Sequence, residues 1–383
     1  SAKQGFDIVI GNPPYVAVRN GVISEADKNN YKKEYKSATG QFDLYALFIE
    51  HGLNILSKGG VLTMITESTF VNNKDFTSLR KLIIHENTLL SIVYLGEEVF
   101  ESASVDVSIS SIKKGQYEKS SQICICASYC DFAEKRYTRL LQSSFDSKEN
   151  NYEIKVRSNL WDIELFERMK SMGVKLGEIA ELPRGIEVGS NAPNIQTTGA
   201  IGYYPMLVGK DIKRYTINFA NRFILFDKLN MSVYKELKIY QQPKILIQRI
   251  RNLTLKDRIV ATYDEEGYTC TNTLRMLYIK EQQLEQQYPL KYILALLNSS
   301  LINYIFRTLF LNKDIYKYQL EQLPIPAATP TEQQPIIDLV DKILAAKKAN
   351  PQTDTTELEE QIDKEVYQLY GLTEQEIQII EGK

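Results

Sequence analysis

The residues Asn-Pro-Pro-Tyr follow directly on an apolar run in the segment DIVIGNPPY, residues 7–15. Residues 7–10 are typical of a buried parallel strand, which Gly11 closes and the two prolines prevent from continuing as sheet or helix. Open α/β sheets bind ligands at the carboxyl ends of their strands. We therefore expect that edge to present a group of residues named here the tetrad: Asn12, Pro13, Pro14 and Tyr15. The alternative is that these residues only end a strand and begin an ordinary loop, with no role in binding.

The tetrad suits a substrate that bears an exocyclic amine on an aromatic ring. The side-chain oxygen of Asn12 and the backbone carbonyl of Pro13 could accept the two N–H groups of that amine and draw its lone pair out of conjugation. Tyr15 could stack on the base, a contact worth about 1–3 kcal/mol, and so help to hold a nucleotide flipped out of its duplex. Methyl transfer from a sulfonium to the lone pair needs in-line placement more than it needs a general base.

Alternating helix and strand signals follow the tetrad and would position it. Apolar residues recur at helical spacing over residues 43–57, and Gly59-Gly60 is expected to end that helix. Further expected elements are a strand at 61–66, a helix at 79–87, and strands at 91–97, 104–114 and 122–128. This order predicts the second half of a Rossmann-like α/β sheet. Because the chain runs straight into a strand, we expect the first half of that sheet to lie upstream.

The pattern changes twice beyond this sheet. Short apolar runs alternate with turn residues up to about residue 326, interrupted by a conspicuous helix at 289–306, which predicts a mixed α+β domain. A linker then precedes two segments with amphipathic helical periods. We expect three domains, at residues 1–155, 156–326 and 327–383, the last of them a helical tail.

Composition excludes several classes of protein and site. The chain has 383 residues and a formal net charge of −2, and it lacks a long apolar run or a basic-then-apolar leader, so we expect a cytoplasmic protein without a membrane segment. His51 and His85 are its two histidines, which disfavours histidine-based catalysis. Cys124, Cys126 and Cys130 lack the spacing of a zinc knuckle, and the alternation in ICICAS favours a strand with thiols on one face. No metal is expected.

Charge is distributed unevenly along the chain. Residues 201–260 hold twelve basic and four acidic residues, a net of +8, whereas residues 328–383 hold five lysines and twelve acids, a net of −7. Tyrosines are interleaved with the basic residues, which favours a nucleic-acid surface over the alternative of a solvated basic face. We expect Lys210, Lys213 and Arg214 to contact phosphates. Arg249 and Arg251 follow the apolar run KILIQ and are the candidates for reading bases of double-stranded DNA.

The segment DIVIGNPPY resembles the catalytic segment of amino-methyltransferases, specifically of the TaqI-like adenine-N6 DNA methyltransferases. The similarity continues through GQFDLYALFIEHGLNILSKGGVLTMITESTF and IVYLGEEVFESASVDVSIS, as far as about Lys114. It implies a catalytic role for the tetrad and a place for Phe100 against the flipped base. It also implies that S-adenosylmethionine is held by Asp7, Asn12, Pro13 and Phe48. Plain helix core is the alternative for Phe48.

The second half of the chain carries its own resemblance. LPRGIEVGSNA, PKILIQRI, LALLNSSLINYIF and KDIYKYQLEQLPIP are similar to target-recognition segments of TaqI-like enzymes and of specificity subunits. The end, EEQIDKEVYQLYGLTEQEI, resembles the tail of large single-chain restriction–modification enzymes and of phage-defence methyltransferases of the PglX kind. These resemblances imply a catalytic half-domain at 1–155, a recognition domain at 156–326 and a tail.

The family's glycine-rich cofactor turn and ribose-binding acid would precede the tetrad, and this sequence has neither. We therefore expect an incomplete cofactor pocket, a chain inactive by itself, and a missing upstream part that contains the first half of the methyltransferase domain. Whether a nuclease domain also lies upstream stays open. Two alternatives stay open. The chain could be a non-catalytic DNA-binding specificity module, or a methyltransferase that acts on protein or RNA.

Overall fold

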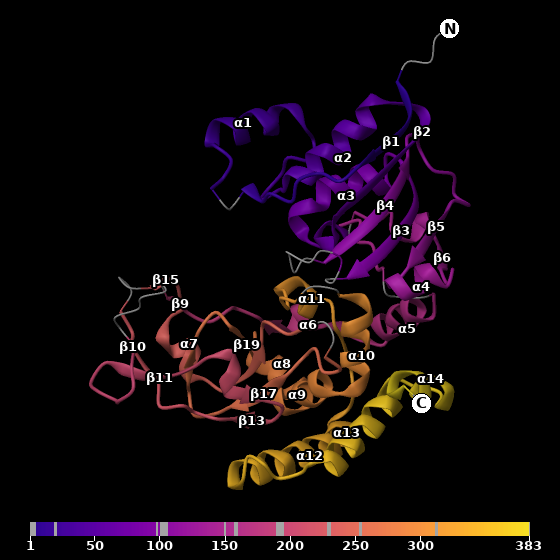
Figure 1. Cartoon of the computed structure of the whole chain (residues 1–383). Helices are drawn as coiled ribbons and strands as arrows, with labels where there is room; N and C mark the ends of the chain where they lie inside the picture. The colour runs from indigo at the N-terminus through magenta and orange to yellow at the C-terminus, as the bar shows by residue number, and fades with distance from the viewer. Residues whose placement is uncertain are drawn as a thin grey trace. The chain divides into compact units, whose positions relative to one another are not determined.

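The computed structural model describes residues 5–18, 21–96, 99, 106–148, 151–156, 160–188, 195–227, 231–252, 255–310 and 313–382. The chain divides into two compact units. The first contains Ser1–Trp161 with Leu309–Leu311, and the second contains Asp162–Thr308 with Asn312–Lys383. In Figure 1 the first unit runs from indigo to magenta, and the second continues from magenta to yellow.

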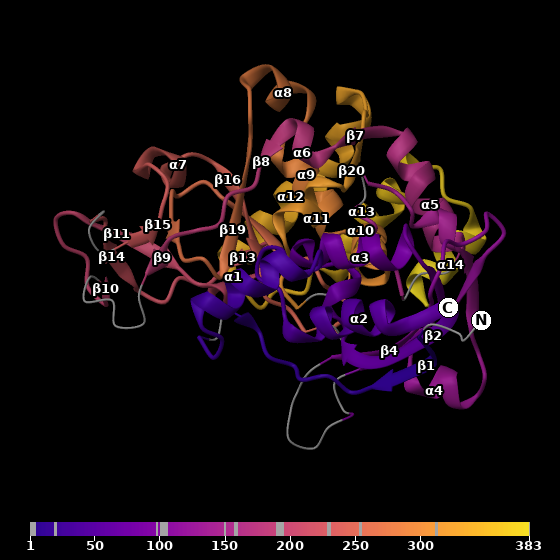
Figure 2. The same cartoon turned by 90° about the horizontal axis from the view of Figure 1, so that it is seen from above.

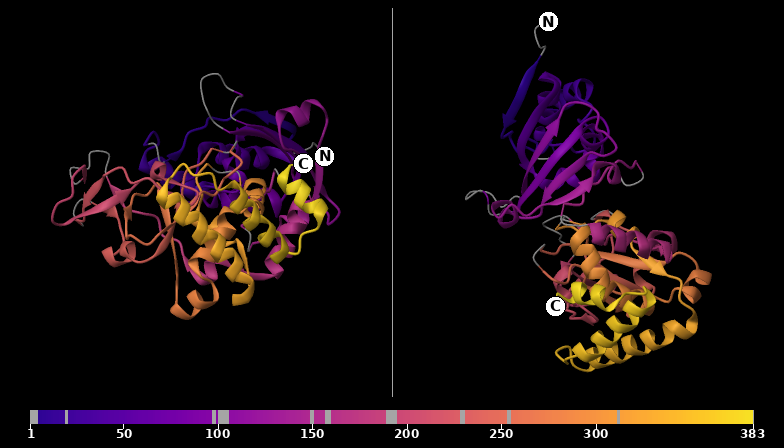
Figure 3. Two further views of the ribbon diagram at one scale, coloured as in Figure 1. Left: turned by 90° about the horizontal axis from the view of Figure 1, so that it is seen from below. Right: turned by 90° about the vertical axis from the view of Figure 1, so that its right-hand side faces the viewer.

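A six-stranded sheet organises the first unit, in the order β1-β2-β4-β3-β5-β6. β1 is parallel to β2 and β3 to β5, while β4 runs antiparallel between β2 and β3. Helices α2 and α3 pack on β2 and β3 (Figure 3). The strands are β1 (Phe6–Gly11), β2 (Leu56–Glu67), β3 (Thr88–Gly96), β4 (Val107–Lys113), β5 (Gln122–Cys126) and β6 (Thr138–Leu141). The helices are α1 (Glu25–Glu34), α2 (Leu44–Ile55), α3 (Thr77–Ile84), α4 (Tyr129–Ala133) and the short 3-10 turns Ser68–Val71, Lys74–Phe76 and Gln142–Ser144.

β1 is an exposed edge strand. The prediction of a strand at these residues is confirmed, but the prediction that the strand is buried was wrong. Its parallel pairing with β2 is as expected, but within the described residues no strand pairs with its other edge. Phe6, Ile8 and Ile10 are 62%, 65% and 77% exposed. An apolar run indicates a strand, but whether each of its faces is covered depends on neighbours that the run does not specify.

The end of α2 also differs from the prediction. The helix ends at Ile55, and Gly59 and Gly60 lie inside β2 instead of capping the helix. Gly59 has a φ of +81°, and a Cβ on Gly60 would lie 2.8 Å from the carbonyl oxygen of Phe6. The two glycines therefore allow β2 to bulge and to pass close to β1.

Several small sheets form the second unit, which confirms a mixed α+β architecture. Two sheets have four strands each, in the orders β10-β14-β11-β18 and β17-β16-β19-β8, and three are pairs: β12-β13, β15-β9 and β20-β7. The strands are β7 (Gly173–Lys175), β8 (Ala180–Glu181), β9 (Glu187–Val188), β10 (Ile195–Gln196), β11 (Tyr203–Leu207), β12 (Ile212–Lys213), β13 (Thr216–Ile217), β14 (Phe223–Leu225), β15 (Met231–Val233), β16 (Lys244–Gln248), β17 (Ala261–Asp264), β18 (Thr269–Cys270), β19 (Leu274–Ile279) and β20 (Pro324–Pro326). The helices before the tail are α5 (Leu160–Ser171), α6 (Leu176–Ile179), α7 (Leu237–Gln241), α8 (Gln282–Gln287), α9 (Leu290–Asn298), α10 (Ser300–Leu309), α11 (Lys317–Glu321) and the 3-10 turn Gly209–Asp211.

The single helix expected at 289–306 is two helices. Ser299 stands between α9 and α10 with φ −64° and ψ 153°, an extended conformation. Its hydroxyl donates to the carbonyl of Leu296 at 2.7 Å and accepts from the N–H of Ile302 at 3.3 Å. Serine competes for backbone hydrogen bonds in this way. The polar run Asn298–Ser300 was the signal of the break within an otherwise apolar helical pattern.

Three helices form the C-terminal end, α12 (Pro330–Ala349), α13 (Thr356–Leu369) and α14 (Glu374–Glu381). Figure 2 shows them in yellow against the second unit, and α12 packs against α9 and α13. Half of the expected linker is helical, because Thr329 and Glu332 form a capping box that starts α12 at Pro330. The α/β part, the α+β part and the terminal helices together confirm the expected fold class.

Candidate functional site

The tetrad lies at the carboxyl end of β1, beside the end of β2. The β1–β2 register finishes with Gly11 opposite Met64, so the chain leaves the sheet as the tetrad begins. Asn12 and Pro14 are exposed, and Pro13 is buried. The Tyr15 hydroxyl donates to the carbonyl oxygen of Ile65 at 3.1 Å. That bond ties the last tetrad residue to the neighbouring parallel strand.

Tyr15 is held in place from two sides. Its ring meets the ring of Tyr45 edge-on, with centroids 6.5 Å apart and planes at 82°, and Tyr45 stacks on Phe76 at 5.4 Å. Burial, and then the nearby carboxylate of Glu67, raise the pKa of Tyr15. The phenol therefore stays protonated at neutral pH, which keeps it a donor to the Ile65 carbonyl.

Helix α2 begins beside the tetrad. Leu44 N–H donates to the Val16 carbonyl at 3.0 Å, and Val18 N–H donates to the Phe42 carbonyl at 3.3 Å. Phe48 on this helix is 45% exposed, although both of its sequence neighbours in the helix are buried. Its ring is therefore not helix core, and the alternative raised for it in the sequence does not hold.

The remaining predicted residues of the first unit lie elsewhere. Asp7 is at the amino end of β1, where the Ser57 hydroxyl donates to its carboxylate at 3.3 Å. Four residues lie between it and Asn12, and the five steps along the strand amount to roughly 16 Å at the usual rise. The structure thus does not bring Asp7 to the tetrad. Phe100 lies outside the described residues.

Sequence reasoning missed the polar group behind Tyr15. The Tyr45 hydroxyl lies 3.1 Å from the Thr69 hydroxyl, which donates to the Glu67 carboxylate at 3.4 Å. Glu67 is the last residue of β2, the strand parallel to β1. A carboxylate directly after the apolar strand VLTMIT was a signal that could have found it, because parallel neighbours end at the same edge.

The predicted phosphate contacts in the second unit differ from one another. Lys210 and Lys213 are exposed. Arg214 instead forms ion pairs with Asp257 at 3.2 Å and with Glu359 of α13 at 2.5 Å. Much of the Arg214 charge is thereby neutralised within the unit, so its contacts give no support to a phosphate role.

The two predicted base readers are also engaged. Arg251 donates to the carbonyl oxygen of Asp257 from Nη2 at 2.8 Å and Nε at 3.2 Å, and from Nη1 to the Gln248 side-chain oxygen at 3.1 Å. The Nε of Arg249 lies 3.8 Å from the Asp314 carboxylate. Burial, with Arg249 as the next cause, lowers the pKa of nearby Arg275 to about 10. Both candidate arginines are half-buried, and the hydrogen bonds of Arg251 fix the direction of its guanidinium.

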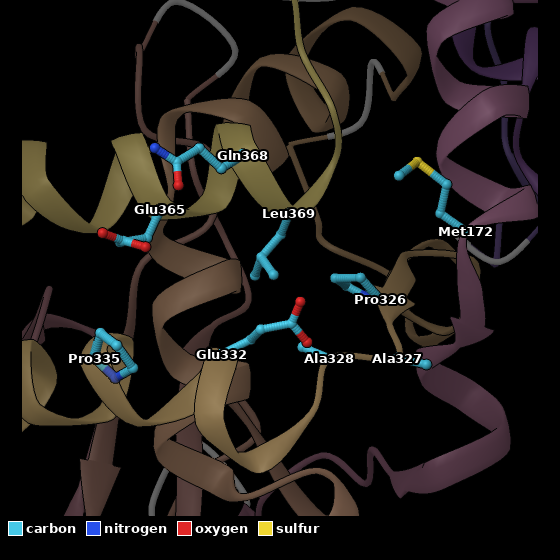
Figure 4. Close-up of a pocket in the computed structure, with 9 residues that line it drawn as sticks. All are labelled: Met172, Pro326, Ala327, Ala328, Glu332, Pro335, Glu365, Gln368 and Leu369. Atoms are coloured by element: carbon cyan, nitrogen blue, oxygen red, sulfur yellow. The ribbon is translucent and has the colours of Figure 1, made fainter.

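A cavity of about 410 Å³ lies in the second unit, between the end of α5, the segment 326–328 and the two longest terminal helices (Figure 4). The carboxylates of Glu332 and Glu365 line it, together with the apolar side chains of Met172 and Leu369. It contains none of the predicted site residues. Among the described residues, no cluster of three metal-binding side chains occurs, and no helix has the length and apolar character needed to span a membrane.

Two family models match the chain, one in each unit. Residues 1–100 match the Eco57I restriction-modification methylase model, and residues 204–325 match the TaqI-like C-terminal specificity domain. The first match contains the tetrad and Phe48. The second contains Lys210, Lys213 and the three predicted arginines.

Two relatives extend the similarity along the chain. A Methanocaldococcus jannaschii protein, provisionally named a type II restriction enzyme and methyltransferase, is 26% identical over 96% of this chain and 31% of its own length. The type II methyltransferase M.TthHB8I of Thermus thermophilus is 26% identical over 86% of this chain and 75% of its own length. The chain thus spans about a third of the first relative and three quarters of the second.

A solved structure shares the fold. The type IIL restriction-modification enzyme MmeI, solved in complex with DNA, covers 96% of this chain with a TM-score of 0.63 and 12% identity, and the match spans 54% of that structure's chain. The likeness supports a methyltransferase-like sheet followed by the α+β unit and helices. The two family models and the two relatives together show that this chain is similar to type II restriction-modification methyltransferases, with a methylase match in the first unit and a TaqI-like specificity-domain match in the second.

Proposed function

We propose that this chain is the catalytic and target-recognition part of a site-specific DNA adenine-N6 methyltransferase in a restriction–modification enzyme. The observation that carries the proposal is the exposed Asn12 amide at the carboxyl end of β1, backed by a Tyr15 ring that is fixed to β2. A flipped adenine presents its amine and its ring face together, and these two side chains offer an acceptor and an aromatic surface for them.

The chemistry proposed for the tetrad is polarisation of the target amine. Asn12 Oδ1 accepts one amine N–H and the Pro13 carbonyl accepts the other, so the nitrogen lone pair turns away from the ring. Tyr15 stacks on the base and needs no change of protonation, which its raised pKa favours. The proton lost after methylation passes to solvent, because the N-methylated amine is acidic enough to release it without a dedicated base.

S-adenosylmethionine would supply an electrophilic methyl group. Phe48 fits the adenine of this cofactor, since it presents an exposed ring on the helix that begins beside the tetrad. Asp7, at the opposite end of β1, has no comparable place. The described residues thus fit one part of the cofactor, and we propose that upstream residues of a longer protein complete the pocket.

The exposed edge of β1 supports this proposal for an upstream part. Within the described residues no strand pairs with the outer edge of β1, which exposes the apolar side chains of Phe6, Ile8 and Ile10. Edge strands of this kind are usually covered or blocked by charges. A preceding strand that pairs with β1 would cover it and bring further residues to the same ligand-binding edge. We propose that the complete protein acts in the cytoplasm, where its duplex DNA substrate is found.

A second candidate, a DNA-binding specificity module without catalysis, is favoured by the partial cofactor site. Asn12→Ala, made in a longer form of the protein that methylates DNA, separates the two. We expect methyl transfer to fall about 100-fold or more, as when one preorganised polar group is removed from an active site, with DNA affinity unchanged within a few-fold. Single-turnover transfer of labelled methyl and a DNA titration measure both. Transfer at the normal rate in this variant would favour the module.

A further inference from the structure

A hollow of about 440 Å³ in the second unit gathers cations from three separate segments. Lys213 comes from the β12–β13 hairpin, Arg251 from the segment after β16, and Lys347 from the last turn of α12. The first two lie within the specificity-domain match, and Lys347 lies beyond it, in the terminal helices. The name cationic hollow is used below for this site.

Arg251 is preorganised at the wall of the cationic hollow. Its guanidinium donates to the Asp257 carbonyl and to Gln248 Oε1, and Gln248 is itself fixed because its Nε2 donates to the carbonyls of Gly209 and Ile212 at 2.9 and 2.8 Å. A cation held in this way loses little further freedom when it meets an anion. Gln248 thus acts on Arg251 as a positioning residue.

The side chains that line the hollow carry a local excess of positive charge. Arg214 also lines it, so four lining cations face two lining carboxylates, Asp257 and Glu359. Two further carboxylates act from outside the lining, Asp363 on Arg214 and Asp354 on Lys347. Arg214 uses its Nη1 and Nη2 for these carboxylates, while its buried Nε has no hydrogen-bond partner among the described residues. The Lys347 ammonium donates to the carbonyl of Thr353 at 2.6 Å and keeps two N–H groups for another acceptor.

We propose that the cationic hollow binds one phosphodiester of duplex DNA, and that Lys347 from the terminal helices completes the contact with Lys213. The proposal rests on the DNA recognition proposed above and adds a contribution from outside the specificity-domain match. A local excess of positive charge, a preorganised guanidinium and an exposed lysine are the features that a backbone phosphate requires, and none of them reads sequence. The site therefore adds affinity for any duplex.

The double variant Lys213→Gln/Lys347→Gln of the full 383-residue chain tests this site. Because each neutralised phosphate contributes about 0.9 to the slope of log K against log salt, removing one contact should lower the slope by about 0.9. At 0.15 M salt the same relation gives a loss of affinity of roughly fivefold. The loss should be equal on unrelated duplexes. The variant Lys213→Arg/Lys347→Arg should restore the binding.

Lys348→Gln is the matched control on the same helical turn, because the Lys348 ammonium faces Glu265 and Glu266. Its DNA affinity and salt slope should equal those of the parent chain, and thermal unfolding checks that every variant folds. An unchanged slope in the folded double variant, or a fall of twice the expected size, overturns the one-phosphate site. If the parent chain binds no duplex at all, the proposed DNA recognition itself fails.

Inorganic phosphate alone provides the remaining arm of the test. The proposal assigns the hollow to a phosphodiester of DNA, so millimolar phosphate should not raise the unfolding temperature of the parent chain. A rise that the double variant abolishes, together with unchanged DNA binding, would assign the hollow to a small free anion and contradict the proposal.

Discussion

The tetrad edge of the first unit and the basic region of the second unit use their functional groups in opposite ways. At the tetrad edge Asn12, the proposed acceptor of the target amine, is exposed, and a hydrogen bond to the Ile65 carbonyl holds Tyr15. In the basic region Arg214 and Arg251 are bonded to groups of the protein itself. A short motif at a strand end thus predicts where its side chains lie. A count of basic residues, by contrast, does not say which of them are free to contact DNA and which are bonded within the protein.

The same contrast holds for buried carboxyls. In the second unit Asp211 pairs with Arg222, Asp264 with Lys244, and Glu359 with Arg214. In the first unit, burial raises the pKa of Glu153 to about 7, and the field of Arg80 only partly opposes it. The Arg80 guanidinium is occupied by carbonyls, among them that of Phe70. Burial also raises the pKa of Asp264 and Asp363 in the second unit, partly opposed by Lys244 and Arg214. Glu153 is therefore one of several groups through which we expect pH to act on stability.

The largest effect should come from breaking the Arg214 ion pairs. Arg214→Ala leaves the carboxylates of Glu359 and Asp257 without this cation, and we expect the free energy of unfolding to fall by up to about 3 kcal/mol. Urea unfolding of the full chain measures it. Lys210→Gln, at an exposed lysine nearby, should leave stability unchanged and lower DNA affinity. If the two variants behave alike, the division between structural and available cations is wrong.

A second effect depends on pH through Glu153. Its folded pKa of about 7 lies above the value near 4.5 of an unfolded chain, so the folded state holds the proton more tightly. The stabilisation is complete below about pH 4.5 and is lost as pH rises to about 7, by at most about 3 kcal/mol. Glu153→Gln should remove this component of the pH profile and be the more stable protein at pH 8. If the free energy of unfolding of Glu153→Gln falls with rising pH as it does in the parent chain, the pH dependence comes from another group.

The smallest effect on stability is expected at Phe48. Because the ring is 45% exposed, Phe48→Ala should change the free energy of unfolding by about 0.5 kcal/mol or less. In a longer, cofactor-binding form of the protein, the same change should weaken binding of S-adenosylmethionine, measured by calorimetry. Leu53→Ala, a buried neighbour on α2, is the control and should cost about 2–5 kcal/mol. A destabilised Phe48→Ala protein with normal cofactor binding would return Phe48 to a packing role.

The order of helices and strands in the first unit could be predicted because each element shows its own periodic spacing of apolar residues. The strands after the tetrad, the helix that contains Phe48 and the fold class are all confirmed. The failures concern information that is not local. Gly60 is required because the Phe6 carbonyl of β1 passes close to it, and Gly59 because its φ is positive. The break at Ser299 depends on a side-chain hydrogen bond between two apolar helical segments.

The candidate sites were predictable to a different degree. The position of the tetrad at a strand end follows from its sequence alone, since a strand must stop at two prolines. The partners of Arg214 and the contribution of Lys347 to the hollow come from the terminal helices, which the charge pattern set apart as an acidic tail. Long-range pairing of charges cannot be read from composition, so the predicted roles of individual arginines remain predictions.

The uncovered edge of β1 has a consequence for handling the chain as well as for its chemistry. Backbone donors and acceptors beside the side chains of Phe6, Ile8 and Ile10 form a template on which a second molecule can add a strand. Any preparation in which this edge stays open should therefore aggregate through intermolecular sheets as its concentration rises. A lysine in place of Ile8, a residue that blocks edges in natural sheets, should suppress that growth in light-scattering measurements. The strand that carries the tetrad would then also set the solubility of the protein.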